Sequence, residues 1–152
     1  MRNLANNLFR LYYQHRFRRI EYIMENPLEA QQAIFKMLIS NGQYTEWGLK
    51  YRFDEVRSPE VYAQRMPVQR YEDFHSYIER MMKGERDVLW PGRTHLFSKS
   101  SGTTNNKSKF IPVSSENFKD CHIKGTWDTM TLLYNRKPDC RIFAGKNFLM
   151  AG

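Results

Sequence analysis

We predict an α+β fold for this chain of 152 residues. Helices come first, followed by a β-hairpin, a further helix, and a terminal strand or strand pair. Apolar residues recur at three-to-four spacing through most segments before residue 84 and again over 118–134, which indicates amphipathic helices. Two short, β-prone arms, 95–97 and 110–113, flank a polar core, which is the pattern of a strand, a loop and a returning strand.

The first helix is predicted over residues 3–24. Its apolar stripe consists of Leu4, Leu8, Leu11, Tyr12, Ile20 and Ile23. Most arginines of this segment lie off that stripe. The cluster 14–19 combines such bases with aromatic residues, so it could bind RNA. A solvated basic face, with arginine stems lying over apolar surface, is the more common role of such a cluster.

Start and stop signals predict the second helix. Asn26 is expected to cap it, with Pro27 at its first position and Glu29 completing a capping box. Asn41 and Gly42 are expected to end it.

The segment that follows carries weaker signals. Residues 45–53 are predicted to be irregular, and Ser58 begins a short helix. A further helix starts at Tyr71 and stops at Gly84. Residues 90–92, a Trp-Pro-Gly turn, lead into the first arm of the hairpin.

After the hairpin, Ser114 or Ser115 is expected to cap a long helix, which residues 137–139 break. Residues 141–144 and 148–150 are predicted to be strands. The sequence stops directly after this apolar run, and a terminal strand exposes an unpaired edge. We therefore expect a truncated chain that can self-associate through exposed strand edges.

The composition is that of a globular protein, with 41% hydrophobic and 14% aromatic residues. Its apolar runs are far too short to cross a membrane, and its N-terminus lacks the apolar region of a secretory signal. Cys121 and Cys140 show no metal or redox spacing, and the four histidines form no ligand pair. We expect a cytoplasmic protein with no membrane partner and no metal site of its own.

The net charge of +8 is unevenly distributed. Residues 1–24 carry +4 (five bases, one acid), 25–97 carry −1 (ten bases, eleven acids), 98–124 carry +3 (five bases, two acids) and 125–152 carry +2 (four bases, two acids). A basic stripe for nucleic acid is one explanation. A local phosphate site together with one solvated basic helix is the other. The second explains the near-neutral middle, so a nucleic-acid partner is not expected.

The hairpin 96–114 contains the candidate site. Its centre consists of hydroxyls, amides, lysines and a single glycine, which suits an anion better than an apolar core. Gly102 lets backbone N–H groups converge, hydroxyls add donors, and lysines add positive charge. The candidate phosphate-binding residues are Ser100, Ser101, Gly102, Thr103, Thr104, Lys107 and Lys109.

The two common glycine-rich phosphate motifs do not fit this loop. A Walker motif starting at Gly102 needs a second glycine at position 107, which is a lysine. The dinucleotide motif fails because Gly102 stands alone. Composition alone favours a polar hairpin tip without a ligand.

A family resemblance strengthens the phosphate-loop interpretation. Residues 100–104, the lysines that follow and Phe110-Ile111-Pro112 resemble the nucleotide motif of the auxin-responsive-promoter family of acyl acid–amido synthetases, in the adenylate-forming superfamily. The resemblance covers roughly residues 30–152 and continues in order through Thr45-Glu46-Trp47-Gly48, Phe53 with Ser58, Pro67-Val68 with Tyr71-Glu72-Asp73, Tyr77-Ile78-Glu79-Arg80, Gly84-Glu85, Pro91-Gly92 and Gly145-Lys146 to Ala151-Gly152.

The resemblance implies an ATP-dependent ligase. Members of the family use ATP and magnesium to convert a carboxylic acid to an acyl-adenylate, then pass the acyl group to an amine, often that of an amino acid. Residues 1–152 would be the N-terminal part of a larger α/β adenylate-forming domain, inactive alone. The loop at 96–114 would hold the ATP phosphates.

The resemblance leaves several roles open. The magnesium ligands and the residues that select acid and amine would lie downstream, and the catalytic residues are unknown. Either Lys107 or Lys109 would reach the phosphates. The alternative function is a non-catalytic basic module that binds nucleic acid or nucleotide.

Overall fold

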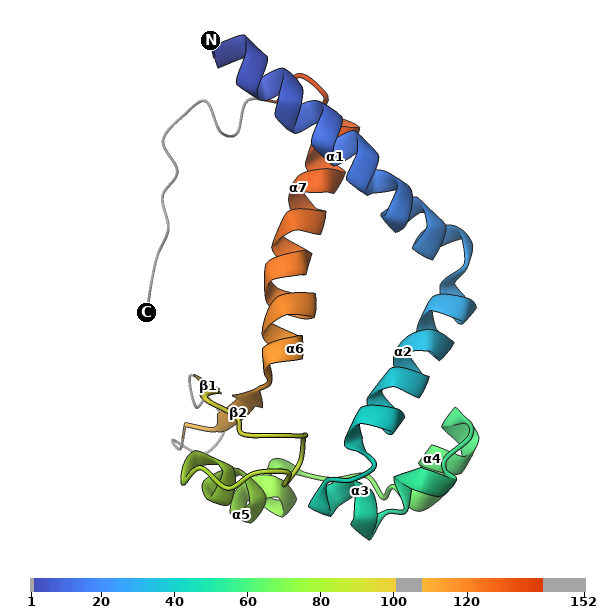
Figure 1. The fold of residues 1–152 in the computed structure, drawn as a ribbon, viewed down its shortest axis with the longest axis vertical. Coiled ribbons are helices and arrows are strands. Elements are labelled where there is room, and N and C mark those ends of the chain that lie inside the picture. The colour runs from blue at the N-terminus through green and yellow to red at the C-terminus, as the bar shows by residue number, and fades with distance from the viewer. Residues whose placement is uncertain (1, 101–107, 141–152) are drawn as a thin grey trace. The chain divides into compact units, whose positions relative to one another are not determined.

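The computed structural model describes residues 2–100 and 108–140, and side chains from residue 7 onward. The chain forms two compact units, which we describe separately (Figure 1). The first contains residues 1–27 and 119–152, and the second contains residues 28–118. The predicted strands at 141–144 and 148–150 lie outside the described residues.

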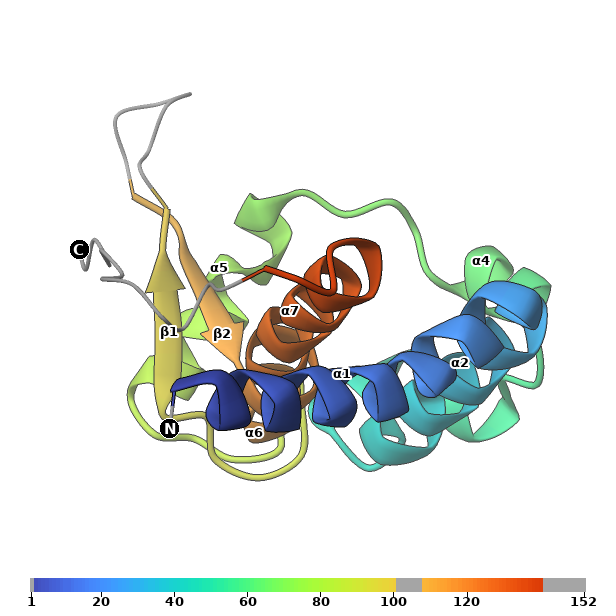
Figure 2. The ribbon, with the colours of Figure 1, turned by 90° about the horizontal axis from the view of Figure 1, so that it is seen from above.

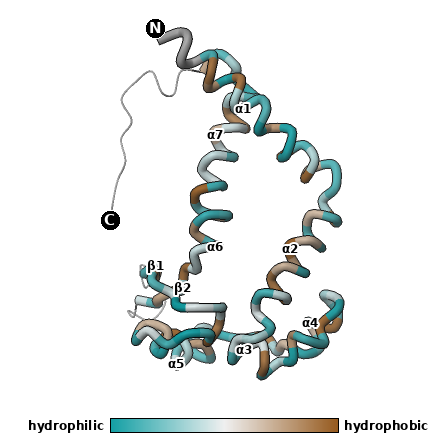
Figure 3. The backbone as a smooth tube through the Cα atoms, viewed as in Figure 1, coloured by the Kyte–Doolittle hydropathy of each residue, from teal (hydrophilic) through white to brown (hydrophobic). Residues whose placement is uncertain are grey.

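The first unit is built on two helices, α1 (Arg2–Glu25) and α7 (Lys124–Arg136), which pack against each other. Both show hydrophobic and hydrophilic stretches in alternation, as amphipathic helices do (Figure 3). Tyr13 and Tyr134 are fully buried, and their rings stack with centroids 4.9 Å apart. Burial raises the pKa of both phenols. The predicted helix over 3–24 is therefore confirmed. Its predicted apolar stripe was wrong as the packing face, because Leu8, Leu11, Tyr12 and Ile23 are exposed, whereas Tyr13, which lies off that stripe, is the buried side chain.

The second unit begins with a series of helices that surround an aromatic core. They are α2 (Pro27–Gly42), α3 (Glu46–Lys50), the 3₁₀ turn η1 (Phe53–Glu55), α4 (Pro59–Arg65) and α5 (Tyr71–Met82). Ile39, Trp47, Phe53 and Val56 form the buried cluster at their centre. Most predicted boundaries are confirmed: Ser58 caps α4, and Gly84 follows α5 with a φ of +94°.

The prediction that 45–53 is irregular was wrong. The hydroxyl of Thr45 accepts a hydrogen bond from the Gly48 N–H at 3.0 Å and so caps α3. Position 48 must be glycine, because a Cβ there would lie 2.0 Å from the carbonyl oxygen of Gly42. Helix α3 has five residues, which are too few for a periodic pattern of apolar residues to be recognised in the sequence.

The second helix starts at Pro27 as predicted, and the side chain of Asn26 bonds to the end of the preceding helix. The side-chain amide of Asn26 donates to the carbonyl of Tyr22 at 3.0 Å, near the C-terminus of α1. One residue thus satisfies the end of one helix where the next begins.

The two apolar arms form the predicted hairpin. Strand β1 (Leu96–Lys99) pairs antiparallel with β2 (Phe110–Val113), and Leu96 lies opposite Val113. Figure 2 shows the two strands side by side. Helix α5 packs against β2. This hairpin is the sheet of the described structure, so the α+β class is confirmed.

The helical segment after the hairpin is less regular than predicted. Ser114 caps α6 (Ser115–Asn117), and the wider π-helical turn η2 (Phe118–Ile123) connects it to α7. The π turn was not predicted, because one inserted residue leaves the apolar spacing nearly unchanged. The helix ends at Arg136, as the sequence predicted. Each helix in the described ranges is too short or too polar to span a bilayer.

Candidate functional site

The described part of the candidate site is the base of the hairpin loop. Ser100 N–H donates to the carbonyl of Lys109 at 2.9 Å, and Lys109 N–H donates to the Ser100 hydroxyl oxygen at 3.0 Å. These two bonds join the points where the polar loop leaves and re-enters the hairpin. Ser100 therefore serves first to close the base of the loop, although its hydroxyl proton can still be donated.

Helix α5 anchors the returning strand of the hairpin. The hydroxyl of Tyr71 accepts a hydrogen bond from the Phe110 N–H at 2.9 Å and donates to the carbonyl of the same residue at 3.3 Å. Tyr71 is the first residue of α5. The N-cap residue Arg70 donates its backbone N–H to the Asp73 carboxylate at 2.7 Å. This bond stabilises the first turn of α5, to which Tyr71 belongs.

The ammonium group of Lys109 lies against the same end of α5. Its nitrogen is 3.6 Å from a carboxylate oxygen of Glu72 and 5.0 Å from the centroid of the Tyr71 ring. The side chains of Lys109 and Glu72 are 41% and 66% exposed, so solvent weakens their attraction. The ammonium group is held near the loop and stays accessible to an anion.

The structure brings two of the seven predicted site residues together, Ser100 and Lys109. The other five lie outside the described residues: Ser101, Gly102, Thr103, Thr104 and Lys107. Their roles stay predictions.

Sequence reasoning did not assign Tyr71 and Glu72 to the site. In the sequence they mark only a helix start and a part of the family resemblance. Tyr71 and Phe110 are separated by 39 residues, and no periodicity links positions so far apart. The available signal was the resemblance itself, since the Tyr71-Glu72-Asp73 match and the loop match occur together.

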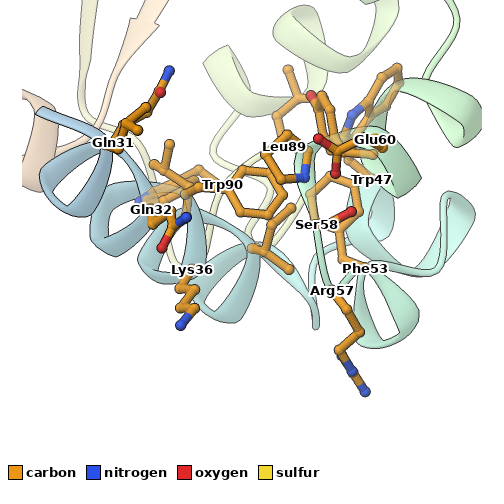
Figure 4. A pocket seen from close by; sticks show the side chains of 17 residues that line it. Gln31, Gln32, Lys36, Trp47, Phe53, Arg57, Ser58, Glu60, Leu89 and Trp90 are labelled. Carbon is orange, nitrogen blue, oxygen red and sulfur yellow. The ribbon is translucent and has the colours of Figure 1, made fainter.

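A pocket elsewhere in the same unit has different chemistry. It has a volume of about 960 Å³ and is lined by α2, residues 47–62 and Leu89–Trp90. Figure 4 shows Lys36 and Arg57 extending away from the ring of Trp90. Its walls are mainly aromatic and aliphatic, with Glu60 adding a carboxylate to the two cationic side chains. This pocket suits a phosphate far less than the hairpin does.

Comparison with known proteins decides the family. Residues 16–149 match the GH3 family N-terminal domain. The chain belongs to the GH3 family. The match contains the whole hairpin and α5, and it confirms the resemblance that the sequence predicts.

Two curated GH3 relatives illustrate the similarity. The jasmonoyl–L-amino acid synthetase JAR6 of Nicotiana attenuata is 32% identical over 90 residues, which cover 57% of this chain and 15% of the relative. The indole-3-acetic acid-amido synthetase GH3.15 of Arabidopsis thaliana is 27% identical over 101 residues, covering 66% of this chain and 17% of the relative. The chain thus spans less than a fifth of the length of either relative.

A solved structure of a GH3 protein has the same fold. The structure of the GH3.15 acyl acid amido synthetase aligns with a TM-score of 0.69 and 26% sequence identity. The alignment covers 77% of this chain and 21% of the solved chain. The folded chain thus resembles one part of a larger amido synthetase.

Proposed function

We propose that this chain is the N-terminal part of an ATP-dependent ligase. The complete protein activates a carboxylic acid as an acyl-adenylate and transfers the acyl group to an amine or amino acid. Membership of the GH3 family supports the proposal, since the relatives are named as synthetases that join an acid to an amine or amino acid. The observation that carries it is the polar loop, whose base is closed by Ser100 and Lys109.

The role of the chain in this reaction is to hold the ATP phosphates. When a carboxylate oxygen attacks the α-phosphorus, the bond to pyrophosphate breaks and negative charge develops on the phosphate oxygens. Hydroxyl and N–H donors stabilise that charge, and a protein nucleophile is not needed. The proposed donors are the hydroxyls of Ser101, Thr103 and Thr104, with Gly102 permitting close approach and Lys107 or Lys109 supplying positive charge.

Magnesium would neutralise part of the phosphate charge in this reaction. The described residues contain no cluster of three or more His, Cys, Asp or Glu side chains. In our proposal the magnesium ligands, and the residues that select acid and amine, come from the rest of the complete protein.

A pair of threonine substitutions tests the proposal. Thr103→Ala combined with Thr104→Ala in the complete protein should lower acid-dependent ATP–pyrophosphate exchange by a factor on the order of a hundred or more, because two phosphate donors are lost. The matched control is Thr126→Ala with Thr129→Ala in α7. Both residues are exposed, and their hydroxyls donate to the carbonyls of His122 in η2 and of Gly125 in α7. Equal exchange in the two double variants would contradict the site.

A further inference from the structure

We propose that Tyr71 is a positioning residue for the phosphate loop, because it fixes the point at which the loop re-enters the hairpin. This inference rests on the proposed function and deepens it. Tyr71 uses both its hydroxyl and its ring: the hydroxyl binds the backbone of Phe110, and the ring lies beneath the ammonium group of Lys109.

The strand geometry explains why a tyrosine hydroxyl suits this position. In an antiparallel pair, successive residues direct their N–H and C=O groups alternately toward and away from the partner strand. Lys109 directs both groups toward Ser100 across the hairpin. Phe110 therefore directs its N–H and C=O groups away from β1. There the Tyr71 hydroxyl accepts a hydrogen bond from the N–H and donates one to the C=O, as a neighbouring strand would. Consecutive residues of β2 are held from opposite sides.

The charges around Lys109 leave its ammonium group able to bind a phosphate. Its ammonium group lies beside the first turn of α5, where the helix dipole disfavours a cation. Glu72 offsets this, but the pair is exposed and 3.6 Å apart, so it contributes little. A bound polyphosphate carries far more negative charge than one carboxylate. The ammonium group can thus turn from Glu72 to a phosphate while Tyr71 holds its backbone in place.

Fixing the backbone in advance should strengthen nucleotide binding. A loop whose ends are already placed loses less conformational freedom when phosphates bind. Without the Tyr71 hydroxyl, the base of the loop would keep the two hydrogen bonds to Ser100 but lose the two hydrogen bonds that attach Phe110 to α5. The expected consequence is weaker ATP binding, with little effect on binding of the carboxylic acid.

The anchor itself is tested by amide hydrogen exchange of Tyr71→Phe, which removes the hydroxyl and keeps the ring. We expect the Phe110 amide to exchange about tenfold faster, because its acceptor is lost. The matched control is Tyr77→Phe. Tyr77 lies on the same helix, and its hydroxyl bonds to Lys50 at 3.0 Å, so its loss should leave Phe110 unchanged. Unaltered exchange at Phe110 in Tyr71→Phe would overturn the anchor.

The positioning role is tested by ATP–pyrophosphate exchange in the complete protein. Tyr71→Phe should raise the KM for ATP about fivefold to tenfold, because it removes the two hydrogen bonds to the Phe110 backbone. The KM for the carboxylic acid should stay unchanged. A general loss of stability would not separate the two constants. An unchanged KM for ATP, or an equal rise in both constants, would overturn the inference.

The threonine variants separate this inference from the proposed function. If ATP–pyrophosphate exchange survives in Thr103→Ala with Thr104→Ala, the assignment of this loop to the ATP phosphates is wrong, and the positioning role of Tyr71 fails with it. If that double variant loses ATP–pyrophosphate exchange while Tyr71→Phe keeps the wild-type KM for ATP, only the positioning role of Tyr71 fails.

Discussion

Two regions of this chain carry the excess positive charge, and they use it differently. In α1, Arg16 donates two hydrogen bonds to one oxygen of Asp128, at 2.7 and 3.0 Å, and their side chains are only 22% and 31% exposed. In the hairpin, Lys109 faces Glu72 across 3.6 Å with both side chains more exposed. The first pair joins two helices, whereas the second leaves an ammonium group accessible to an anion.

The difference shows that the net charge of a segment does not indicate its role. The role of each charged side chain follows from the groups with which it interacts. The α1 segment has the larger excess, +4 over residues 1–24, against +3 over 98–124. One of its arginines is paired with Asp128 beside the buried Tyr13–Tyr134 stack. Arg16 therefore has a structural role, because it joins α1 to α7.

The largest expected effect tests whether the first unit is a packed core. Tyr134→Ala removes a fully buried ring that stacks on Tyr13, and should destabilise the first unit by about 3–5 kcal/mol. Tyr44→Ala is the control, because that side chain is 78% exposed. Chemical denaturation followed by circular dichroism measures both. Equal midpoints for the two variants would mean that α1 and α7 do not form a stabilising core.

A pair of glycine substitutions sharpens the comparison at the level of the backbone. Gly48→Ala in the second unit should destabilise by more than about 3 kcal/mol, because its Cβ would meet the Gly42 carbonyl at 2.0 Å. Gly125→Ala in α7 meets nothing within 4 Å and should stabilise by about 1 kcal/mol through helix propensity. Thermal unfolding of both variants checks the signs. A neutral Gly48→Ala would contradict the capped α3 turn.

The two ion pairs themselves provide the next comparison. Asp128→Ala should cost about 1–2 kcal/mol, because it leaves the half-buried Arg16 without its partner. Glu72→Ala should cost less than about 0.5 kcal/mol, since that pair is exposed. Urea denaturation of the two variants measures the difference. A larger loss for Glu72→Ala would reverse our account of the two regions.

The smallest expected effect concerns acid stability of the second unit. The hydrogen bond from Arg80 lowers the pKa of Glu85 below its usual 4.5. A carboxylate with a lowered folded-state pKa stabilises the protein above its unfolded pKa, and this stability is lost as the pH falls through the folded value. Arg80→Gln should therefore make stability less dependent on pH below about 4.5. Melting temperatures at pH 3 and pH 6 check this, and Arg65→Gln should act in the same direction, because the hydrogen bond from Arg65 likewise lowers the pKa of Glu55.

Local signals in the sequence predicted most of the fold. Pro27, Ser58 and Gly84 act on their immediate neighbours, so caps and stops could be placed without tertiary information. The α3 turn could not, because it depends on a close approach between Gly48 and Gly42. The π turn at η2 likewise leaves little trace in the apolar pattern.

The candidate site was predicted in composition but not in its support. Hydroxyls, a glycine and lysines identified the loop, and the family resemblance supported a nucleotide. The bonds from Tyr71 to Phe110 join positions 39 residues apart, which no local pattern encodes. Likewise, only the structure shows that the Ser100 hydroxyl closes the base of the loop.

The measurement that tests the central claim most directly is ATP–pyrophosphate exchange by the complete protein, with and without carboxylic acids. The account predicts that labelled pyrophosphate enters ATP only when a suitable acid is present, and that Thr103→Ala with Thr104→Ala abolishes this exchange. Exchange that does not depend on an acid, or that survives the double substitution, would contradict a phosphate loop serving acyl-adenylate formation.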